Sequence, residues 1–207
     1  MPLSLRMRGF RKVKTKGGHA FKRNGVTGIP FSEEKIQRIP FLAGTKVRVA
    51  TAKRGKKNIR VAIGEVSPKK AARGFGILAR MRRDGLTRVA FPLGFKVDRK
   101  RGKGYLFTLF RPGYNLRSPA YHKLKKSQKQ AVNLAVIRSL EQCHKRGWLL
   151  RDRNATNIIF HVTKKGTIVI THIDPHTAVK FKGSKAHFDE LAKREMRYVY
   201  EMLASLK

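Results

Sequence analysis

Acidic residues are scarce in this sequence. Its 207 residues include 12 Asp and Glu against 49 Lys and Arg, so the formal net charge is +37. Cationic side chains at this density repel one another unless anions neutralise them. The composition therefore predicts a polyanionic partner, such as a nucleic acid or a nucleoprotein assembly.

Cysteine and long apolar runs are also missing. Cys143 is the only cysteine, which excludes an internal disulfide framework and a multi-cysteine metal site. We therefore expect an intracellular reducing compartment, the cytoplasm or nucleus, or packaging in a virion. No apolar run is long enough to span a bilayer, and Arg6 and Arg8 interrupt the first apolar residues. Neither a membrane span, a signal peptide nor a membrane partner is expected.

A folded core is nevertheless predicted, because 41% of the residues are hydrophobic and 12 of them are Phe. Residues 1–31 contain no acid, and their basic residues are spaced among glycines. We expect a basic arm that lies along phosphates, although a solvated tail or a nuclear-import patch would have the same composition. The candidate nucleic-acid-binding residues are Arg6, Arg8, Arg11, Lys12, Lys14, Lys16, Lys22 and Arg23.

The hydrophobic periodicity predicts an α+β fold. In the first half, Ser32 predicts the start of a short helix. Alternating hydrophobic and polar residues between turn residues then predict five strands around one further helix. The second half predicts a buried helix, a loop, a hairpin and a final amphipathic helix, with Leu134 and Ile137 widening the apolar face of the buried helix. The predicted strands cover 39–43, 46–51, 58–66, 87–97, 105–110, 157–162 and 167–173, the helices 67–83, 128–145 and 186–206, and the loop 148–155.

The loop between the buried helix and the hairpin carries a distinctive pattern of polar residues. A His and a Gly end the helix, an Arg-Asp pair follows, an Asn lies five residues after that Asp, and another Asp ends the hairpin. These residues are His144, Gly147, Arg151, Asp152, Asn157 and Asp174. Their spacing resembles the catalytic loop and metal-binding motif of the protein kinases.

The resemblance implies a role for each matching residue. Asp152 would be the catalytic base that accepts the proton of an attacking hydroxyl, and Asn157 and Asp174 would hold Mg²⁺ against the phosphates of ATP. The segment around Leu109 and Arg111 looks like the hinge that meets adenine. Lys46 could reach the phosphates, as could many other lysines.

Several positions depart from the kinase pattern. Gly64 stands where the strand Val-Ala-Ile-Lys of the family has its lysine, and no acid lies between Glu65 and Asp84 to replace the helical glutamate. The glycine-rich loop is reduced to Gly-Thr-Lys at residues 44–46. The metal-binding motif reads Asp-Pro-His at 174–176 instead of Asp-Phe-Gly.

The resemblance implies a kinase-like two-lobe fold with a small antiparallel sheet in the first lobe and a reduced helical second lobe. The expected divisions are a basic arm over 1–36, the first lobe over 37–110 and the second over 111–207. The short segment after Asp174 resembles that of the minimal atypical kinases of the RIO type.

Two functions are consistent with this interpretation. The first is phosphorylation of Ser or Thr in proteins, with ATP and Mg²⁺, by an enzyme associated with a nucleic-acid-containing assembly. The alternative is a catalytically impaired kinase fold that serves as a basic structural component of a virion or ribonucleoprotein particle. A plain RNA-binding ribosomal-type protein is a third interpretation, but it leaves the spacing of the catalytic loop unexplained.

Overall fold

The computed structural model describes residues 10–15, 18–23, 33–40, 47–54, 57–151 and 154–206. The chain divides into two compact units. The first comprises Met1–Ala79 and Phe91–Phe110, and the second comprises Arg80–Ala90 and Arg111–Lys207. None of the helices in the described part of the chain has the length and apolar character that a membrane span requires.

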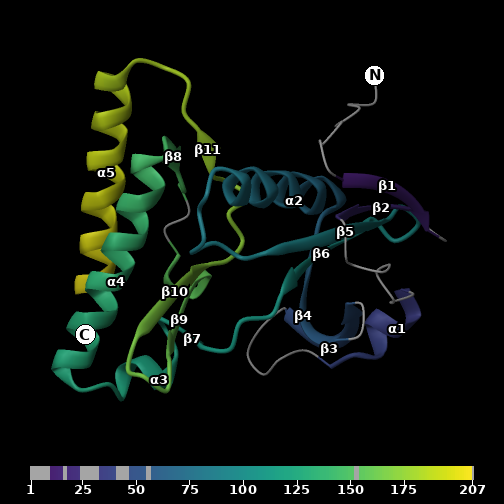
Figure 1. The fold of residues 1–207 in the computed structure, drawn as a ribbon, viewed down its shortest axis with the longest axis horizontal. Coiled ribbons are helices and arrows are strands. Elements are labelled where there is room, and N and C mark those ends of the chain that lie inside the picture. Colours follow the sequence, from purple (N-terminus) through teal and green to yellow (C-terminus); the bar gives the residue numbers. More distant parts are fainter. Residues whose placement is uncertain are drawn as a thin grey trace. The chain divides into compact units, whose positions relative to one another are not determined.

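The first unit is built around a four-stranded antiparallel sheet of strand order β3-β4-β6-β5 (Figure 1). Its strands are β3 (Val47–Arg54), β4 (Lys57–Val66), β5 (Pro92–Asp98) and β6 (Lys103–Leu109). Two helices belong to it, α1 (Glu33–Arg38) and the start of α2 (Pro68–Arg83). A separate antiparallel hairpin, β1 (Phe10–Thr15) and β2 (Gly18–Arg23), contacts β5 through β2.

Each face of this sheet buries a different helix. On one face, Ile63 of β4 and Phe107 of β6 pack with Ile36 of α1 in a common core. On the other face, Gly104 of β6 lies directly beneath the start of α2. A Cβ atom at Gly104 would lie 2.7 Å from the Ser67 carbonyl oxygen, so only glycine permits this close approach of the helix to the strand.

The second unit combines three helices with short antiparallel sheets. Strand order β10-β9-β7 forms one sheet, and β8 pairs with β11 in the other. The helices are α3 (Pro119–His122), α4 (Lys126–Lys145) and α5 (Lys185–Ala204). The remaining elements are β7 (Tyr114–Asn115), β8 (Trp148–Leu149), the 3-10 turn η1 (Ala155–Asn157), β9 (Ile158–Val162), β10 (Ile168–His172) and β11 (Val179–Lys180).

Helix α4 supplies the central apolar surface of this unit. Val132, Val136 and Leu140 are buried at helical spacing along it. The prediction that Leu134 widens this face is wrong, because that side chain is 46% exposed. Leu134 lies two residues from both Val132 and Val136, which turns it to the opposite side of the helix.

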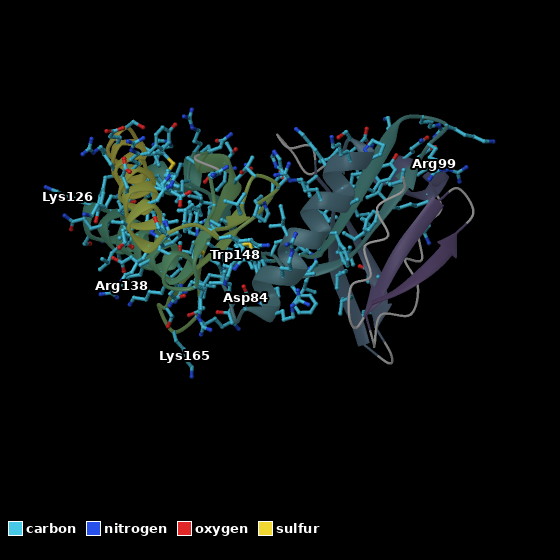
Figure 2. The ribbon with its side chains drawn as sticks, turned by 90° about the horizontal axis from the view of Figure 1, so that it is seen from above. Asp84, Arg99, Lys126, Arg138, Trp148 and Lys165 are labelled. Carbon is cyan, nitrogen blue, oxygen red and sulfur yellow. The ribbon has the colours of Figure 1, made fainter. Side chains whose placement is uncertain are left out.

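Asp84, just after α2, links three segments of the second unit. Its Oδ2 accepts hydrogen bonds from Trp148 Nε1 at 2.8 Å and from Lys180 Nζ at 2.9 Å (Figure 2). Burial raises the pKa of Asp84, but the hydrogen bonds from Lys180 and Trp148 outweigh this effect and lower it. The carboxylate thereby ties β8 and β11 to the end of α2.

The element predictions were correct for the long helices and for the hairpin of β9 and β10, and wrong for parts of some strands and of one loop. Strand β5 begins at Pro92, not at residue 87, and Val89 forms an isolated parallel bridge with His172 instead. Residues 148–155 are not entirely a loop, since β8 lies within them. Ile39 and Pro40 belong to no strand, and residues 41–43 lie outside the described residues.

Candidate functional site

The start of the catalytic-loop-like segment is anchored by a buried acid on α5. Glu195 Oε1 accepts a hydrogen bond from the backbone nitrogen of Arg151 at 2.5 Å, and its Oε2 accepts one from that of Leu150 at 3.3 Å. His144 Nε2, near the end of α4, donates to the same Oε2 at 2.8 Å. A single carboxylate therefore fixes the loop to the two helices on which the second unit is built. Glu195 is 5% exposed.

The sequence analysis did not identify Glu195. A detectable signal was present, because residue 195 falls on the apolar stripe of the final helix, between Leu191 and Val199. An acid on an otherwise apolar helix face requires hydrogen-bond partners in the core. Here those partners are the amides of the loop.

Two residues of the site have a left-handed backbone. Arg151 has φ 57° and Asp174 has φ 53°, and they are the positive-φ residues other than glycine among the described residues. This conformation is costly for side chains with a Cβ and is characteristic of functional loops that the surrounding structure holds in place. Asp152, the candidate base, follows Arg151 directly but lies outside the described residues.

The hairpin brings the two candidate metal ligands to the same place. Asn157 directly precedes β9, Asp174 follows β10, and Ile158 pairs with His172 in the register of these strands. The backbone nitrogen of Ile173 donates to the Asn157 carbonyl oxygen at 2.9 Å. Asn157 and Asp174 therefore leave the same end of the hairpin, on adjacent strands.

A small recess lies between the hairpin and the loop. Its lining comprises Leu150, Asn157, Ile158, His172, Ile173 and Pro175, and it has room for about one water molecule. Thr177 Oγ1 donates to the Leu150 carbonyl oxygen at 3.0 Å and so ties the segment after Asp174 to the start of the loop.

The Asp174 carboxylate has a close neighbour from its own turn. His176 Nδ1 lies 2.9 Å from Asp174 Oδ1 and 3.2 Å from the Asp174 carbonyl oxygen. The side chains of His176 and Asp174 are 26% and 41% exposed, so both are accessible to solvent. The described residues contain no cluster of three His, Cys, Asp or Glu side chains that could hold a metal ion by itself.

The residues of the second unit fit a divalent cation that is shared with a phosphate ligand. Carboxylate and amide oxygens, as on Asp174 and Asn157, are suitable ligands for Mg²⁺, which usually takes few protein ligands and keeps several waters or phosphate oxygens. The exposed position of the carboxylate agrees with a cation that arrives together with such a ligand.

In the first unit, there is space for a side chain at Gly64, the position at which the resemblance to kinases implies a lysine. Gly64 lies on β4 opposite Leu106 of β6, and a Cβ there would meet only the Leu106 carbonyl oxygen, at 4.0 Å. The next residue, Glu65, forms ion pairs with Lys103 at 2.6 Å and Arg48 at 3.8 Å. This acid is therefore engaged within the sheet.

The other predicted ligand-binding residues are distributed along the chain as follows. Leu109 ends β6, where its backbone nitrogen donates to the Phe91 carbonyl oxygen at 2.8 Å. Arg111, the first residue of the second unit after that strand, is exposed. Lys46 lies outside the described residues.

The candidate nucleic-acid-binding residues fall partly on the first hairpin, which the sequence analysis did not predict. Arg11, Lys12 and Lys14 lie on β1, and Lys22 and Arg23 lie on β2. The register pairs Arg11 with Lys22. Arg6, Arg8 and Lys16 lie outside the described residues.

Comparison with solved structures identifies the fold. The chain matches the yeast RNA polymerase II CTD kinase complex CTDK-1 with a TM-score of 0.51 and 17% identity over 70% of this chain and 47% of that one. It matches the BubR1 kinase domain with a TM-score of 0.50 and 11% identity over 82% of this chain and 50% of that one. No protein-family profile and no curated protein sequence matches the chain. The fold is therefore kinase-like, and the chain spans about half the length of these two structures.

Proposed function

We propose that this protein is a compact kinase-like phosphotransferase that uses ATP and a divalent cation. The observation that carries this proposal is the arrangement of the second unit, in which Asn157 and Asp174 leave the same end of one hairpin. The neighbouring loop is held by Glu195 in a left-handed conformation at Arg151. A loop needed only to connect two elements would not require a buried carboxylate to fix it.

Each residue has a definite role in this proposal. Asp152 accepts the proton of the attacking hydroxyl as the new bond to the γ-phosphorus forms and the bond to the ADP oxygen breaks. Asn157 and Asp174 hold the cation, which neutralises charge on the transferred phosphoryl group. The proposed acceptor is a Ser or Thr hydroxyl of a protein.

The compact segment after Asp174 supports the likeness to minimal atypical kinases of the RIO type. Only residues 175–184 separate Asp174 from the start of α5 at Lys185. This interval leaves no room for a long activation segment, so we propose that the acceptor is brought to the site by the assembly to which the protein binds.

A second function is favoured by the first unit. Kinases bind the α- and β-phosphates with a strand lysine that is held by a helical glutamate. Here Gly64 stands at the position of that lysine, and α2 carries no acid. With a net charge of +37, the same fold would serve as a structural, nucleic-acid-binding component of a virion or ribonucleoprotein particle. The cytoplasm, the nucleus or a virion is the proposed location in either case.

Thermal unfolding with nucleotide distinguishes the two functions. A phosphotransferase should be stabilised by Mg²⁺-ATP or Mn²⁺-ATP, because a ligand that binds only the folded state raises the unfolding temperature. Asp174→Asn should abolish this shift, whereas Asp189→Asn, at an exposed position on α5, should retain it. Absence of a shift in the folded wild-type protein would contradict the enzymatic proposal and leave the structural one.

A further inference from the structure

Tyr114 is an exposed aromatic side chain at the edge of a sheet in the second unit. Its strand, β7, is the outer strand of the order β10-β9-β7, and Tyr114 lies opposite Phe160 of β9 in the register. Phe160 is buried, whereas Tyr114 is 59% exposed, the largest exposed fraction among the described large hydrophobic residues. The centres of the two rings are 6.1 Å apart, so the tyrosine ring rests against the core while most of the side chain is open to solvent.

The backbone on both sides of Tyr114 is held in place. Gly113, which has φ 146°, lies so close to β9 that a Cβ atom there would collide with the Phe160 carbonyl oxygen. After the strand, Asn115 Oδ1 accepts a hydrogen bond from the backbone nitrogen of Arg117 at 2.9 Å, and Ser118 Oγ donates to the Asn115 carbonyl oxygen at 2.6 Å. The exposed ring is therefore carried by an ordered segment, which lowers the entropy that a binding partner has to overcome.

A cationic surface adjoins this ring. Helix α3 contacts β7, and Tyr121 of α3 packs edge-on against Phe160 with 5.9 Å between the ring centres. Lys129 Nζ of α4 lies 5.8 Å from the centre of the Tyr121 ring, so the start of α4 belongs to the same part of the second unit. The exposed cations here are Arg117, Lys123, Lys125 and Lys126, the last of which projects outward in Figure 2.

These cations have no acidic partners. The sequence contains no Asp or Glu between Asp98 and Glu141. Among the described residues, none of the ion pairs involves any of these four side chains. Neighbouring cations without acids repel one another, and bound phosphates relieve that repulsion. The surface around Tyr114 is therefore complementary to a polyanion.

We propose that Tyr114 and the four cations form a binding surface for single-stranded nucleic acid. An unpaired base stacks on the Tyr114 ring, and the neighbouring phosphates lie along the cations. This inference rests on the association with nucleic acid in the proposed function, since it names the form of nucleic acid and the place where it binds. A duplex offers its phosphates but keeps its bases stacked on one another, so only a single strand can use both the ring and the cations. Neither contact involves the 2′-hydroxyl group, and RNA and DNA strands should bind alike.

The test is fluorescence anisotropy of the full chain with labelled oligo(dT), oligo(rU) and a DNA duplex of equal length. Tyr114→Ala should weaken binding of both single strands about fivefold or more and binding of the duplex by less than about twofold. Tyr114→Phe should retain the wild-type affinity, because its ring can still stack. Tyr200→Ala removes a tyrosine of α5 that is 52% exposed, and this matched control should change neither affinity.

A second variant tests the cations separately from the ring. Replacing Lys123 and Lys126 together by Gln should weaken binding of strand and duplex alike and reduce the magnitude of the slope of log affinity against log salt. Tyr114→Ala should leave that slope unchanged, because it removes no charge.

Three outcomes would overturn the inference. If Tyr114→Ala weakens strand and duplex equally, or neither, the stacking role is wrong and the association with nucleic acid stands. If the double lysine variant keeps the wild-type slope, the phosphates bind elsewhere on the chain. If the folded wild-type protein binds neither strand nor duplex, the association with nucleic acid is wrong as well. Circular dichroism on each variant verifies that the chain is folded.

Discussion

His172 is a buried histidine whose hydrogen bonds place a proton on Nε2 and whose burial disfavours its charged form. Ser139 Oγ uses its one proton to donate to the Val136 carbonyl oxygen at 2.7 Å. The same oxygen must therefore accept the hydrogen bond from His172, whose Nε2 lies 2.8 Å away. His172 therefore carries a proton on Nε2. Burial lowers the pKa of His172 to about 4.

This histidine should make stability depend on pH. The pKa of His172 is lower in the folded state than in the unfolded state. Its contribution to the free energy of unfolding is therefore fully present above about pH 6.5 and is lost as the pH falls toward 4. From pH 7 to 4.5 the free energy of unfolding should fall by about 2 kcal/mol through His172 alone. Urea unfolding across this range measures the effect.

The matched variants for this prediction are His172→Gln and His161→Gln. The first should flatten the pH dependence, since glutamine does not titrate, and the second, at a partly exposed position on β9, should leave it unchanged. An equal slope in wild type and His172→Gln would show that the buried imidazole does not control acid stability.

Cys143 is a buried thiol of α4, which should make it chemically inert in the native protein. Burial raises its pKa to about 12, and the nearby charge of Glu195 adds to the shift. Thiolate is the reactive form, so labelling by Ellman's reagent at pH 8 should be at least about a hundredfold slower in the folded protein than in urea. Since it is the only cysteine, the signal is unambiguous. Rapid labelling of the native protein would contradict the burial.

At the scale of elements, α5 is the part of the fold that positions the catalytic-loop-like segment. Glu195→Gln should destabilise the protein by about 2–4 kcal/mol, because the amide replaces a buried carboxylate that accepts three hydrogen bonds. Glu190→Gln, in the same helix but 57% exposed, should change stability by less than about 0.5 kcal/mol. Denaturant unfolding compares the two, and equal effects would contradict the anchoring role.

The long elements could be predicted because their patterns are local. Helix α2 has Pro at its first position and ends before Gly85, which has φ 83°. The hairpin of β9 and β10 alternates in hydrophobicity around a Gly turn. These signals depend on a few neighbouring residues and need no knowledge of the tertiary fold.

The short elements could not be predicted because tertiary contacts create them. Strands β8 and β11 have two residues each and are paired across about thirty residues of chain, so neither carries a periodic pattern. The spacing of Asn157 and Asp174 was visible in the sequence, but the hydrogen bonds of Glu195 and the closeness of His176 Nδ1 to the Asp174 carboxylate required the folded chain.

At the scale of the whole molecule, the charge of +37 dominates the expected interactions. Binding to RNA or DNA should weaken steeply with salt, with a slope of log affinity against log salt of about −5 or steeper. Asp174→Asn should leave the slope unchanged. Replacing Arg11 and Lys22 together by Gln should reduce its magnitude by about one for each phosphate that the variant no longer neutralises.

Fluorescence anisotropy with labelled oligonucleotides over a range of salt concentrations measures this slope. Affinity that does not change with salt would contradict a phosphate-directed mode of binding. Loss of nucleic-acid binding in Asp174→Asn would instead show that the kinase-like site and the binding surface are not separate.

The central claim is that the second unit performs phosphoryl transfer, and transfer of labelled γ-phosphate from ATP tests it most directly. The assay uses Mg²⁺ or Mn²⁺ and measures both self-modification and transfer to a basic Ser/Thr protein. The account predicts transfer by the wild type and by Asp189→Asn, and none by Asp152→Asn or Asp174→Asn. No transfer by the folded wild type with either cation, or undiminished transfer by both variants, would contradict it.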